Sequence, residues 1–224
     1  NISEDHLGDI RWKMMKQIPA DVPVMASFDF LAELSGRKEL YAFYKVYNFA
    51  HRETFKLPSH VELALIDFND RWLEEIYRTD PLGTSMYLQQ FFKDGWGVEE
   101  AAENIILFKK GNDKKIIEID TLESNIRYND LHQINDTLAV RQSLPVPAQV
   151  RPNEILPLRF DWAVYEAQEG QYVSQILITQ GETVFVGLNH LTGYKIYPSL
   201  AWKKGDLVRE RYWLTIPSLP PGNY

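Results

Sequence analysis

Alternation of apolar and polar residues over residues 156–164 constrains the fold of this chain more than any other feature. Every second residue of this run is apolar: Leu156, Leu158, Phe160, Trp162 and Val164. A period of two is that of a β-strand with one buried face. A second alternating run covers residues 207–216 and ends at the proline-rich residues 217–222, which stop a strand and turn the chain. The two runs predict a C-terminal half built from strands.

Six strands are predicted after Gly111, where the helical periodicity of the sequence ends. They cover residues 115–119, 137–142, 156–164, 172–179, 184–190 and 207–216, with turn residues between them. This density of short strands is typical of an antiparallel β-sandwich. We therefore predict a β-sandwich domain over residues 112–224.

Helices and strands alternate in the first half of the chain. Apolar periodicity and favourable end residues predict helices over residues 3–18, 72–77 and 82–92. Apolar runs predict strands over residues 22–28, 39–46, 61–68 and 104–109. Such alternation predicts a small Rossmann-like α/β unit over residues 1–111, with a mainly parallel sheet. The predicted fold class is therefore α+β, with two domains.

Composition argues against several functional classes. The formal net charge is −7 and the basic residues are scattered, so we expect no nucleic-acid partner. The absence of cysteine excludes disulfides, zinc–thiolate sites and thiol catalysis. The histidines lack metal-type spacing, and most are expected at the surface or on a backbone partner. Gly95-Trp96-Gly97 lacks the third glycine of a dinucleotide fingerprint and precedes a predicted loop. We expect neither a metal nor a cofactor.

Polar residues directly follow two of the predicted parallel strands. Ser27 and Asp29 come after the first strand, and Asp67, Asn69 and Asp70 come after the third. The carboxyl ends of parallel strands meet at one rim, where α/β folds bind ligands. Carboxylates there could hold a divalent cation against a sugar diphosphate. The alternative is structural, in which Asp70 caps the helix that follows and Asp67 ends the strand.

Arg37 also has two interpretations. It follows the helical turn that begins near Ser27 and Asp29, so it could bind an anionic group at the same rim. Alternatively, Asp29 caps that turn, and Arg37 is solvated or pairs with Glu33 four residues earlier. The sequence leaves both open.

Aromatic residues make up 13% of the chain, and flat rings are suited to stacking against sugars. Trp213 is the strongest single candidate for a sugar-binding ring. Strand alternation places it opposite Tyr212 and Leu214, and therefore outward if those two are buried. In the alternative interpretation, the aromatic side chains fill the core and cover loops.

Five segments of the first half follow one another in a characteristic order and spacing. They are residues 18–27 (IPADVPVMAS), 34–37 (LSGR), 61–67 (VELALID), 97–98 (GV) and 105–111 (IILFKKG). On these segments, the first half resembles the tail of a family of predicted multi-spanning bacterial membrane proteins of unknown function, related to C-type membrane glycosyltransferases. In such proteins this region follows the last membrane helix, on the extracytoplasmic side.

Three segments of the second half carry a separate resemblance. They are residues 158–162 (LRFDW), 202–206 (WKKGD) and 217–224 (PSLPPGNY). These segments are similar to a β-sandwich tail that is often appended to bacterial membrane glycosyltransferase-like proteins. The catalytic acid of those enzymes lies in loops near the first membrane helices. The resemblance therefore assigns no catalytic residue to this chain.

Together the resemblances imply a non-catalytic accessory domain on the extracytoplasmic face of a bacterial membrane. Since the sequence starts at Asn1, we expect upstream transmembrane helices, and the membrane-embedded part of the same parent chain is the first expected partner. A glycan, a lipid-linked sugar or an envelope protein is the expected ligand. The alternative is a glycosyltransferase-type enzyme domain that uses the rim residues Ser27, Asp29, Asp67 and Asp70.

Overall fold

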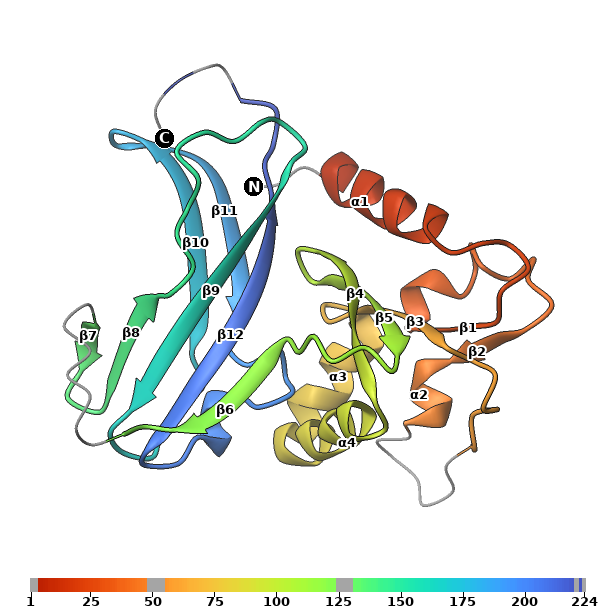
Figure 1. The fold of residues 1–224 in the computed structure, drawn as a ribbon, viewed down its shortest axis with the longest axis horizontal. Helices are drawn as coiled ribbons and strands as arrows, with labels where there is room; N and C mark the ends of the chain where they lie inside the picture. The colour runs from red at the N-terminus through yellow and green to blue at the C-terminus, as the bar shows by residue number, and fades with distance from the viewer. Residues whose placement is uncertain (1–3, 48–54, 124–130, 220–221, 223–224) are drawn as a thin grey trace. The chain divides into compact units, whose positions relative to one another are not determined.

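The computed structural model describes residues 4–47, 55–123, 131–219 and 222 (Figure 1). These residues form a mixed α+β structure with few helices, whose strands belong to three sheets. The chain divides into two compact units, Ile2–Lys115 and Ile116–Tyr224, which we call the N-terminal and C-terminal units. The boundary predicted from the sequence, after residue 111, falls just before this division.

The N-terminal unit contains a five-stranded sheet with the order β2-β1-β3-β5-β4. Its strands are β1 (Val24–Ala26), β2 (Leu40–Ala42), β3 (Leu63–Asp67), β4 (Trp96–Ala102) and β5 (Ile105–Lys110). β1 is parallel to both β2 and β3, whereas β5 is antiparallel to β3 and to β4. The prediction of a mainly parallel sheet is therefore wrong for β4 and β5, because a hairpin, and not a helical crossover, joins them.

Strand β4 was not predicted at all. The glycines that flank Trp96 suggested a loop, but Gly97 lies inside the strand for a packing reason. A Cβ atom on Gly97 would lie 2.2 Å from the carbonyl oxygen of Asn112, so only glycine allows this approach. Gly97 thus allows close backbone packing of β4 against the residues that follow β5.

The helices of the N-terminal unit are α1 (Glu4–Lys16), α3 (Arg71–Thr79) and α4 (Pro81–Lys93), with two short ones, η1 (Phe28–Phe30) and α2 (Phe43–Val46). The predicted strand over residues 39–46 is wrong in its second half, because β2 ends at Ala42 and α2 begins at Phe43. Phe43 and Val46 are both buried, and a spacing of three residues places them on one helical face. A short aromatic run fits either periodicity.

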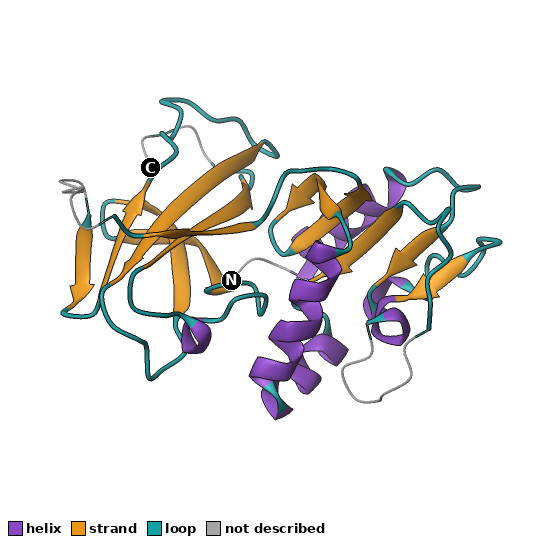
Figure 2. Cartoon of the chain, turned by 60° about the horizontal axis from the view of Figure 1, so that its bottom comes forward, coloured by secondary structure: helices purple, strands orange, loops and turns teal. Residues whose placement is uncertain are grey.

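The regular secondary structure of the C-terminal unit is almost entirely β-strand (Figure 2). An antiparallel sheet has the order β6-β12-β9-β8-β7, and β10 pairs with β11 in a separate two-stranded sheet. The bounds are β6 (Ile117–Thr121), β7 (His132–Asn135), β8 (Leu138–Gln142), β9 (Ile155–Val164), β10 (Val173–Gln180), β11 (Thr183–Leu191) and β12 (Asp206–Thr215). Each of the six predicted strands overlaps one of these. β7 was missed, since it is short and exposed throughout.

The core of the C-terminal unit packs against the apolar face of β9 and β12. Leu138, Trp162, Val164, Trp202 and Val208 form its buried apolar cluster. Phe160 packs edge-on against Tyr212 across the β9–β12 pair, with ring centroids 5.3 Å apart. Of the alternating residues of 156–164, Trp162 and Val164 belong to this cluster, and the partly buried Phe160 packs against it. Leu156 and Leu158 are buried as well.

Trp213 does not face outward as predicted. It is 6% exposed, and every residue from Tyr212 to Ile216 is buried. β12 lies inside the sheet, paired with β6 on one edge and β9 on the other. Because this part of the strand is buried on both faces, alternation cannot identify an exposed side chain there. Trp213 is not available for stacking against a sugar.

Within the described part of the chain, no helix combines the length and apolar character needed to cross a membrane.

Candidate functional site

The carboxyl ends of β1 and β3 lie side by side at one edge of the N-terminal sheet. Ser27 directly follows β1, and its Oγ accepts a hydrogen bond from the backbone N–H of Asp67, the last residue of β3, at 3.0 Å. The N–H of Ser27 donates to the carbonyl of Leu65 at 3.0 Å. This edge, with the residues that follow β1 and β3, is called the rim below.

Arg11 of α1 joins two of the rim carboxylates. Its Nη2 donates to Oδ2 of Asp29 at 2.8 Å and to Oδ2 of Asp67 at 2.9 Å. Apolar periodicity predicts the buried side of α1 but not the partners of its polar residues, so Arg11 is absent from the predicted site. The available signal was its position three residues before Met14, which is buried, so the two share a face of α1.

Asp67 is 3% exposed and has partners for both carboxylate oxygens. Oδ1 accepts from the N–H of Asn69 at 2.8 Å, and Oδ2 accepts from Arg11. Burial raises the pKa of Asp67, while Arg11 and the Asn69 amide act to lower it. For Arg11, burial lowers the pKa, but the two carboxylates outweigh it and raise the pKa overall. We infer a charged pair, since ionised Asp67 accepts every hydrogen bond offered to it.

Asp70 is a helix cap, as one interpretation of the sequence predicted. Its Oδ1 accepts from the N–H groups of Trp72 at 2.9 Å and Leu73 at 3.1 Å, in the first turn of α3. Its Oδ2 accepts from the N–H of Asp29 at 2.8 Å, which ties the segment after β1 to the start of α3. Burial raises the pKa of Asp70, and the backbone donors oppose this rise.

Arg37 does not lie at the rim and does not bind Glu33. Its guanidinium donates to the carbonyl oxygens of Ile18 at 2.7 Å, Val22 at 3.1 Å and Pro19. The chain that leaves α1 passes through these residues, and carbonyls beyond a helix end lack intrahelical partners. The predictions that Arg37 binds an anionic group at the rim or pairs with Glu33 are therefore wrong. Its partly exposed guanidinium instead holds the loop between α1 and β1.

Three aromatic side chains cluster beside the rim. Phe28, Tyr44 and Trp72 follow β1, β2 and β3 respectively, and we call them the aromatic platform. The ring centroids lie 6.4 Å apart for Phe28–Tyr44, 6.4 Å for Phe28–Trp72 and 5.7 Å for Tyr44–Trp72. Phe28 is 52% exposed and Trp72 is 47% exposed. None of the three was selected from the sequence, because their proximity depends on the parallel order of the strands.

A shallow pocket lies among the platform rings. Ser27 and Asp70 are its polar lining, and Phe43 and Leu73 complete the wall. It holds only about 10 Å³ of free space, room for roughly one water molecule. A ligand larger than water therefore has to lie over the exposed rings. The side chain of Asn69 is exposed beside Asp70, and Asp29 is partly exposed, so both present polar atoms near the platform.

The site residues predicted from the sequence thus separate into two groups. Five of them come together at the rim: Ser27, Asp29, Asp67, Asn69 and Asp70. Arg37 binds the loop after α1, and Trp213 is buried in β12. Among the residues that the structure describes, no group of three or more His, Cys, Asp or Glu side chains is arranged to hold a metal ion. The carboxylates instead serve α1, α3 and the backbone.

A second cluster of titratable residues lies in the core of the C-terminal unit. The carboxylate of Glu210 is 0% exposed and accepts from Gly193 N at 2.6 Å, Tyr212 Oη at 2.8 Å and Trp162 Nε1 at 3.2 Å. His190 Nε2 lies 3.1 Å from the same carboxylate. Burial lowers the pKa of His190, although Glu210 acts to raise it. Most of the histidines were expected at the surface or on a backbone partner, and His190 is an exception, because it is buried beside a carboxylate.

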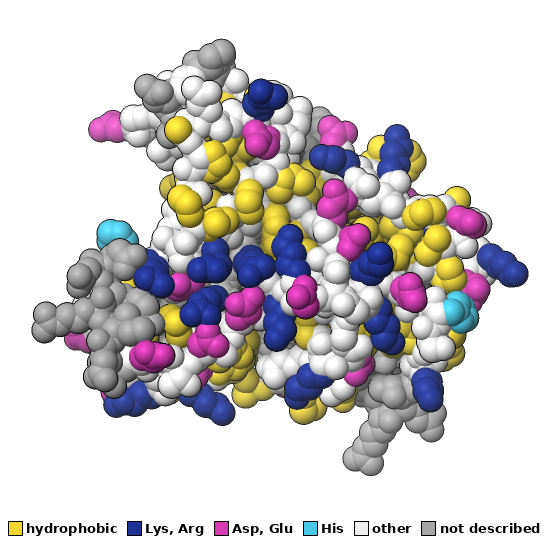
Figure 3. Space-filling model, in the orientation of Figure 1, with side chains coloured by type: hydrophobic (Ala, Val, Ile, Leu, Met, Phe, Trp, Pro, Cys, Tyr) yellow, Lys and Arg dark blue, Asp and Glu magenta, His cyan; other side chains and the backbone are white. Residues whose placement is uncertain are grey.

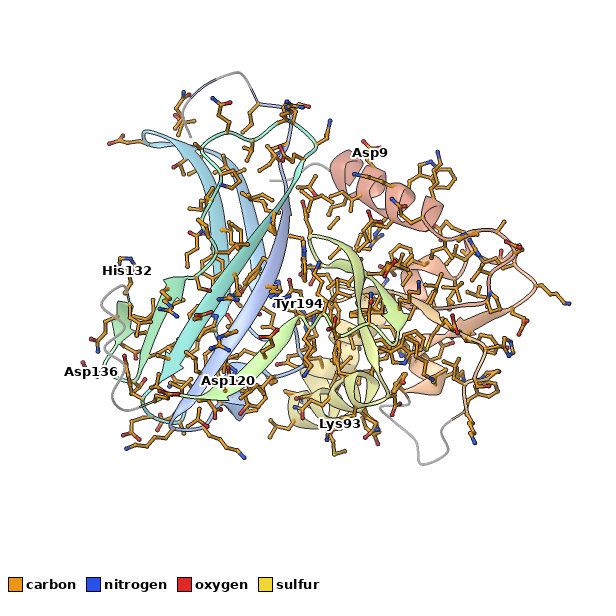
Figure 4. The ribbon with its side chains drawn as sticks, viewed as in Figure 1. Asp9, Lys93, Asp120, His132, Asp136 and Tyr194 are labelled. Atoms are coloured by element: carbon orange, nitrogen blue, oxygen red, sulfur yellow. The ribbon has the colours of Figure 1, made fainter. Side chains whose placement is uncertain are left out.

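The turn beside Glu210 has an unusual backbone. Gly193, Tyr194 and Lys195 have φ values of 87°, 49° and 61°, so three consecutive residues adopt the left-handed conformation. Tyr194 is labelled in Figure 4, and its hydroxyl donates to the carbonyl of Arg211 at 2.8 Å. Non-glycine residues in this region cost of order 1–3 kcal/mol each. The Glu210 carboxylate, through Gly193, helps to hold this turn.

No protein-family model, no curated protein and no solved structure matches this chain.

Proposed function

We propose that this chain is a non-catalytic, extracytoplasmic accessory region of a polytopic bacterial membrane protein, and that the rim of its N-terminal unit binds carbohydrate. The aromatic platform carries this proposal. Two half-exposed rings and Tyr44 stand together where the parallel strands end. Exposed rings stack on the apolar C–H face of a sugar, and Asp29 and Asn69 would orient its hydroxyl groups.

The strand order supports this choice of site. We interpret the N-terminal unit as a small Rossmann-like α/β unit and the C-terminal unit as a β-sandwich. From β1, the chain passes to β2 on one side and later to β3 on the other. In open α/β sheets, the carboxyl ends of strands at such a reversal form the usual ligand crevice. Ser27 and Asp67 mark that position here.

The hydrogen bonds of the rim support a non-catalytic role. Both oxygens of Asp70 accept backbone N–H groups, and both oxygens of Asp67 accept from Arg11 or Asn69. A general base or nucleophile needs a lone pair directed at its substrate. These carboxylates instead hold three segments of the unit in place.

Titration of the whole chain with saccharides tests the proposal. We expect oligosaccharides of neutral and N-acetylated hexoses to shift the NMR signals of the Trp72 indole and the amides of residues 27–30. The Kd should be roughly millimolar, because a few rings bury little area. Trp72→Ala should abolish binding. Trp12→Ala is the matched control, since Trp12 is 56% exposed on α1. If no saccharide perturbs Trp72, the carbohydrate proposal is wrong.

The alternative function is a glycosyltransferase-type enzyme that uses the rim. One observation favours it, since Asp67 and Asp70 lie near each other and burial raises the pKa of each. Asp29 is the most accessible of the three carboxylates and would be the residue that contacts substrate. Release of sugar from an activated donor by the wild-type chain, lost in Asp29→Asn, would establish this function and replace the first.

The proposed partners are the membrane-embedded part of the parent chain and an envelope component. On the face seen in Figure 3, basic and acidic side chains are interspersed, which supports a partner other than nucleic acid. A topology reporter fused to the C-terminus of the full parent chain tests on which side of the membrane this region lies. Activity of a cytoplasm-specific reporter would contradict the extracytoplasmic proposal.

A further inference from the structure

Arg11 is shared between helix α1 and the loops that carry the aromatic platform. We infer that Arg11 is a positioning residue for the proposed ligand site, and that it couples the docking of α1 to the arrangement of the platform. The claim that Arg11 affects ligand binding rests on the proposed function. The claim that Arg11 links α1 to the platform is structural and can be tested without any ligand.

The coupling follows a continuous chain of contacts. Arg11 holds the carboxylate of Asp29 at 2.8 Å, and the backbone N–H of Asp29 donates to Asp70 at 2.8 Å. Asp70 in turn caps the backbone of Trp72. Phe28 directly precedes Asp29, so two platform rings, Phe28 and Trp72, are each adjacent to a member of this chain.

Arg11 gives α1 a directional attachment, which the apolar side of the helix cannot provide. Ile10, Met14 and Met15 are buried and hold the helix by non-directional packing. The guanidinium instead fixes the helix relative to two specific oxygens, one after β1 and one at the end of β3. It also lies 6.0 Å from the ring centroid of Phe30, at the end of η1. Displacement of α1 would therefore release Asp29 and the segment that presents Phe28.

Such coupling is reciprocal. If attachment of α1 favours the platform geometry that binds a ligand, then the ligand must favour attachment of α1 by the same factor. Anything that displaces α1 would then also change the affinity of the site. Arg11 would transmit the signal in both directions.

Hydrogen exchange of the whole chain tests the structural part. In Arg11→Met we expect exchange to rise about tenfold in α1 and also in residues 27–30, as for loss of a charge-assisted hydrogen bond. Exchange in β9, which belongs to the C-terminal unit, should not change. Lys13→Met is the matched control, because Lys13 is an exposed basic residue on the same helix. Arg11→Lys should restore part of the protection.

Loss of Arg11 also leaves buried Asp67 without its positively charged partner, which by itself could disturb the rim. The double variant Arg11→Met with Asp67→Asn separates this effect from the loss of the contact to Asp29. Asp67→Asn removes the unpaired charge but leaves Asp29 without Arg11. We expect residues 27–30 to remain deprotected in the double variant. Unchanged exchange of residues 27–30 in Arg11→Met would overturn the inference, as would recovery of their protection in the double variant.

The ligand-binding part uses any saccharide that binds the wild-type chain. Its binding should slow exchange of α1 in the wild type but not in Arg11→Met, and its affinity should fall in that variant. Equal protection of α1 in both proteins would refute the coupling while leaving carbohydrate binding intact. If no saccharide binds, the proposed function fails, and the exchange data without ligand still decide the role of Arg11.

Discussion

The Arg11–Asp67 pair is asymmetric in its exposure to solvent. The side chain of Asp67 is 5% exposed, whereas that of Arg11 is 38% exposed. Removing the partner of a buried charge costs more than the pair itself contributes, because the remaining charge stays desolvated. The cost of losing Arg11 therefore arises mainly at Asp67, and it should be reduced when Asp67 is also neutralised.

This asymmetry gives a stability prediction. Arg11→Met should lower the free energy of unfolding by about 2–3 kcal/mol, less than a fully buried pair because Arg11 is partly solvated. Adding Asp67→Asn should recover part of the loss, since the buried unpaired charge is then removed and only the more solvated Asp29 remains without Arg11. Urea unfolding of the two single variants and the double variant measures the coupling energy. Strictly additive losses would contradict the account.

His190 gives a prediction of pH dependence. Burial lowers its pKa in the folded chain below the unfolded value of about 6.5. The folded state therefore prefers neutral His190, and its contribution is fully present above pH 6.5 and is lost as the pH falls below it. The slope from this residue can reach about 1.4 kcal/mol per pH unit.

The measurement compares the wild type with His190→Gln, whose amide can still donate to Glu210. Thermal unfolding between pH 7.5 and pH 5.5 should show a smaller loss of stability in the variant than in the wild type. Other groups titrate in both proteins, so the difference isolates His190. Parallel stability curves for the two proteins would show that His190 does not titrate as proposed.

At the scale of elements, Asp70 has two roles, whereas a simple helix cap has one. It begins α3 through the N–H groups of Trp72 and Leu73, and it holds the segment after β1 through Asp29. Asp80 performs only the first task for α4, where it accepts from Gly83 N at 2.9 Å. The two aspartates are therefore a natural comparison within one chain.

Asp70→Ala should cost about 2 kcal/mol, the upper part of the range for helix caps, and should raise hydrogen exchange in both α3 and residues 27–30. Asp80→Ala should cost about 1 kcal/mol and affect only the first turn of α4. Exchange measured at single-residue resolution separates the two patterns. An effect of Asp70→Ala confined to α3 would show that the contact to Asp29 contributes little.

Elements with a long, consistent pattern could be predicted from the sequence. The predicted strands over residues 61–68 and 156–164 correspond to β3 and β9. A continuous apolar run of this length indicates a strand covered on both faces, and strict alternation indicates a strand with one buried face. Residues 43–46 and 96–102 were assigned wrongly. In the first, an aromatic run fits a strand or a helical turn equally well. In the second, Gly97 meets a packing need imposed by Asn112, which local sequence does not reveal.

The same distinction applies to the candidate site. Asp70 was recognised as a possible cap because its partners lie two and three residues away. Arg11 binds a carboxylate 56 residues away, and the platform combines residues that follow three different strands. Those relations depend on strand order and register. Sequence pattern alone therefore located the rim and missed the side chains that complete it.

At the scale of the whole molecule, each unit contains its own buried interior. Met25, Leu65 and Phe108 are among the fully buried side chains of the N-terminal unit. The C-terminal unit has the cluster around Trp162 and Trp202, with Glu210 buried nearby. A unit with its own core can in principle unfold by itself. A defect in one core should then leave the other protected.

Glu210→Gln tests this independence. The carboxylate of Glu210 accepts hydrogen bonds from three donors, on Gly193, Tyr212 and Trp162. The side-chain amide of the variant would direct N–H groups toward these donors, in place of a second acceptor oxygen. One donor then loses its acceptor, at a cost of about 1–3 kcal/mol. Hydrogen exchange should rise in β9 and β12 and stay unchanged in β3 and β5. Glu118→Gln is the control, because Glu118 is partly exposed in its pair with Arg211 and its loss should cost little. If exchange in β3 rises as much as in β12, the two units unfold together, and the rim would then share its stability with the buried cluster of the other unit.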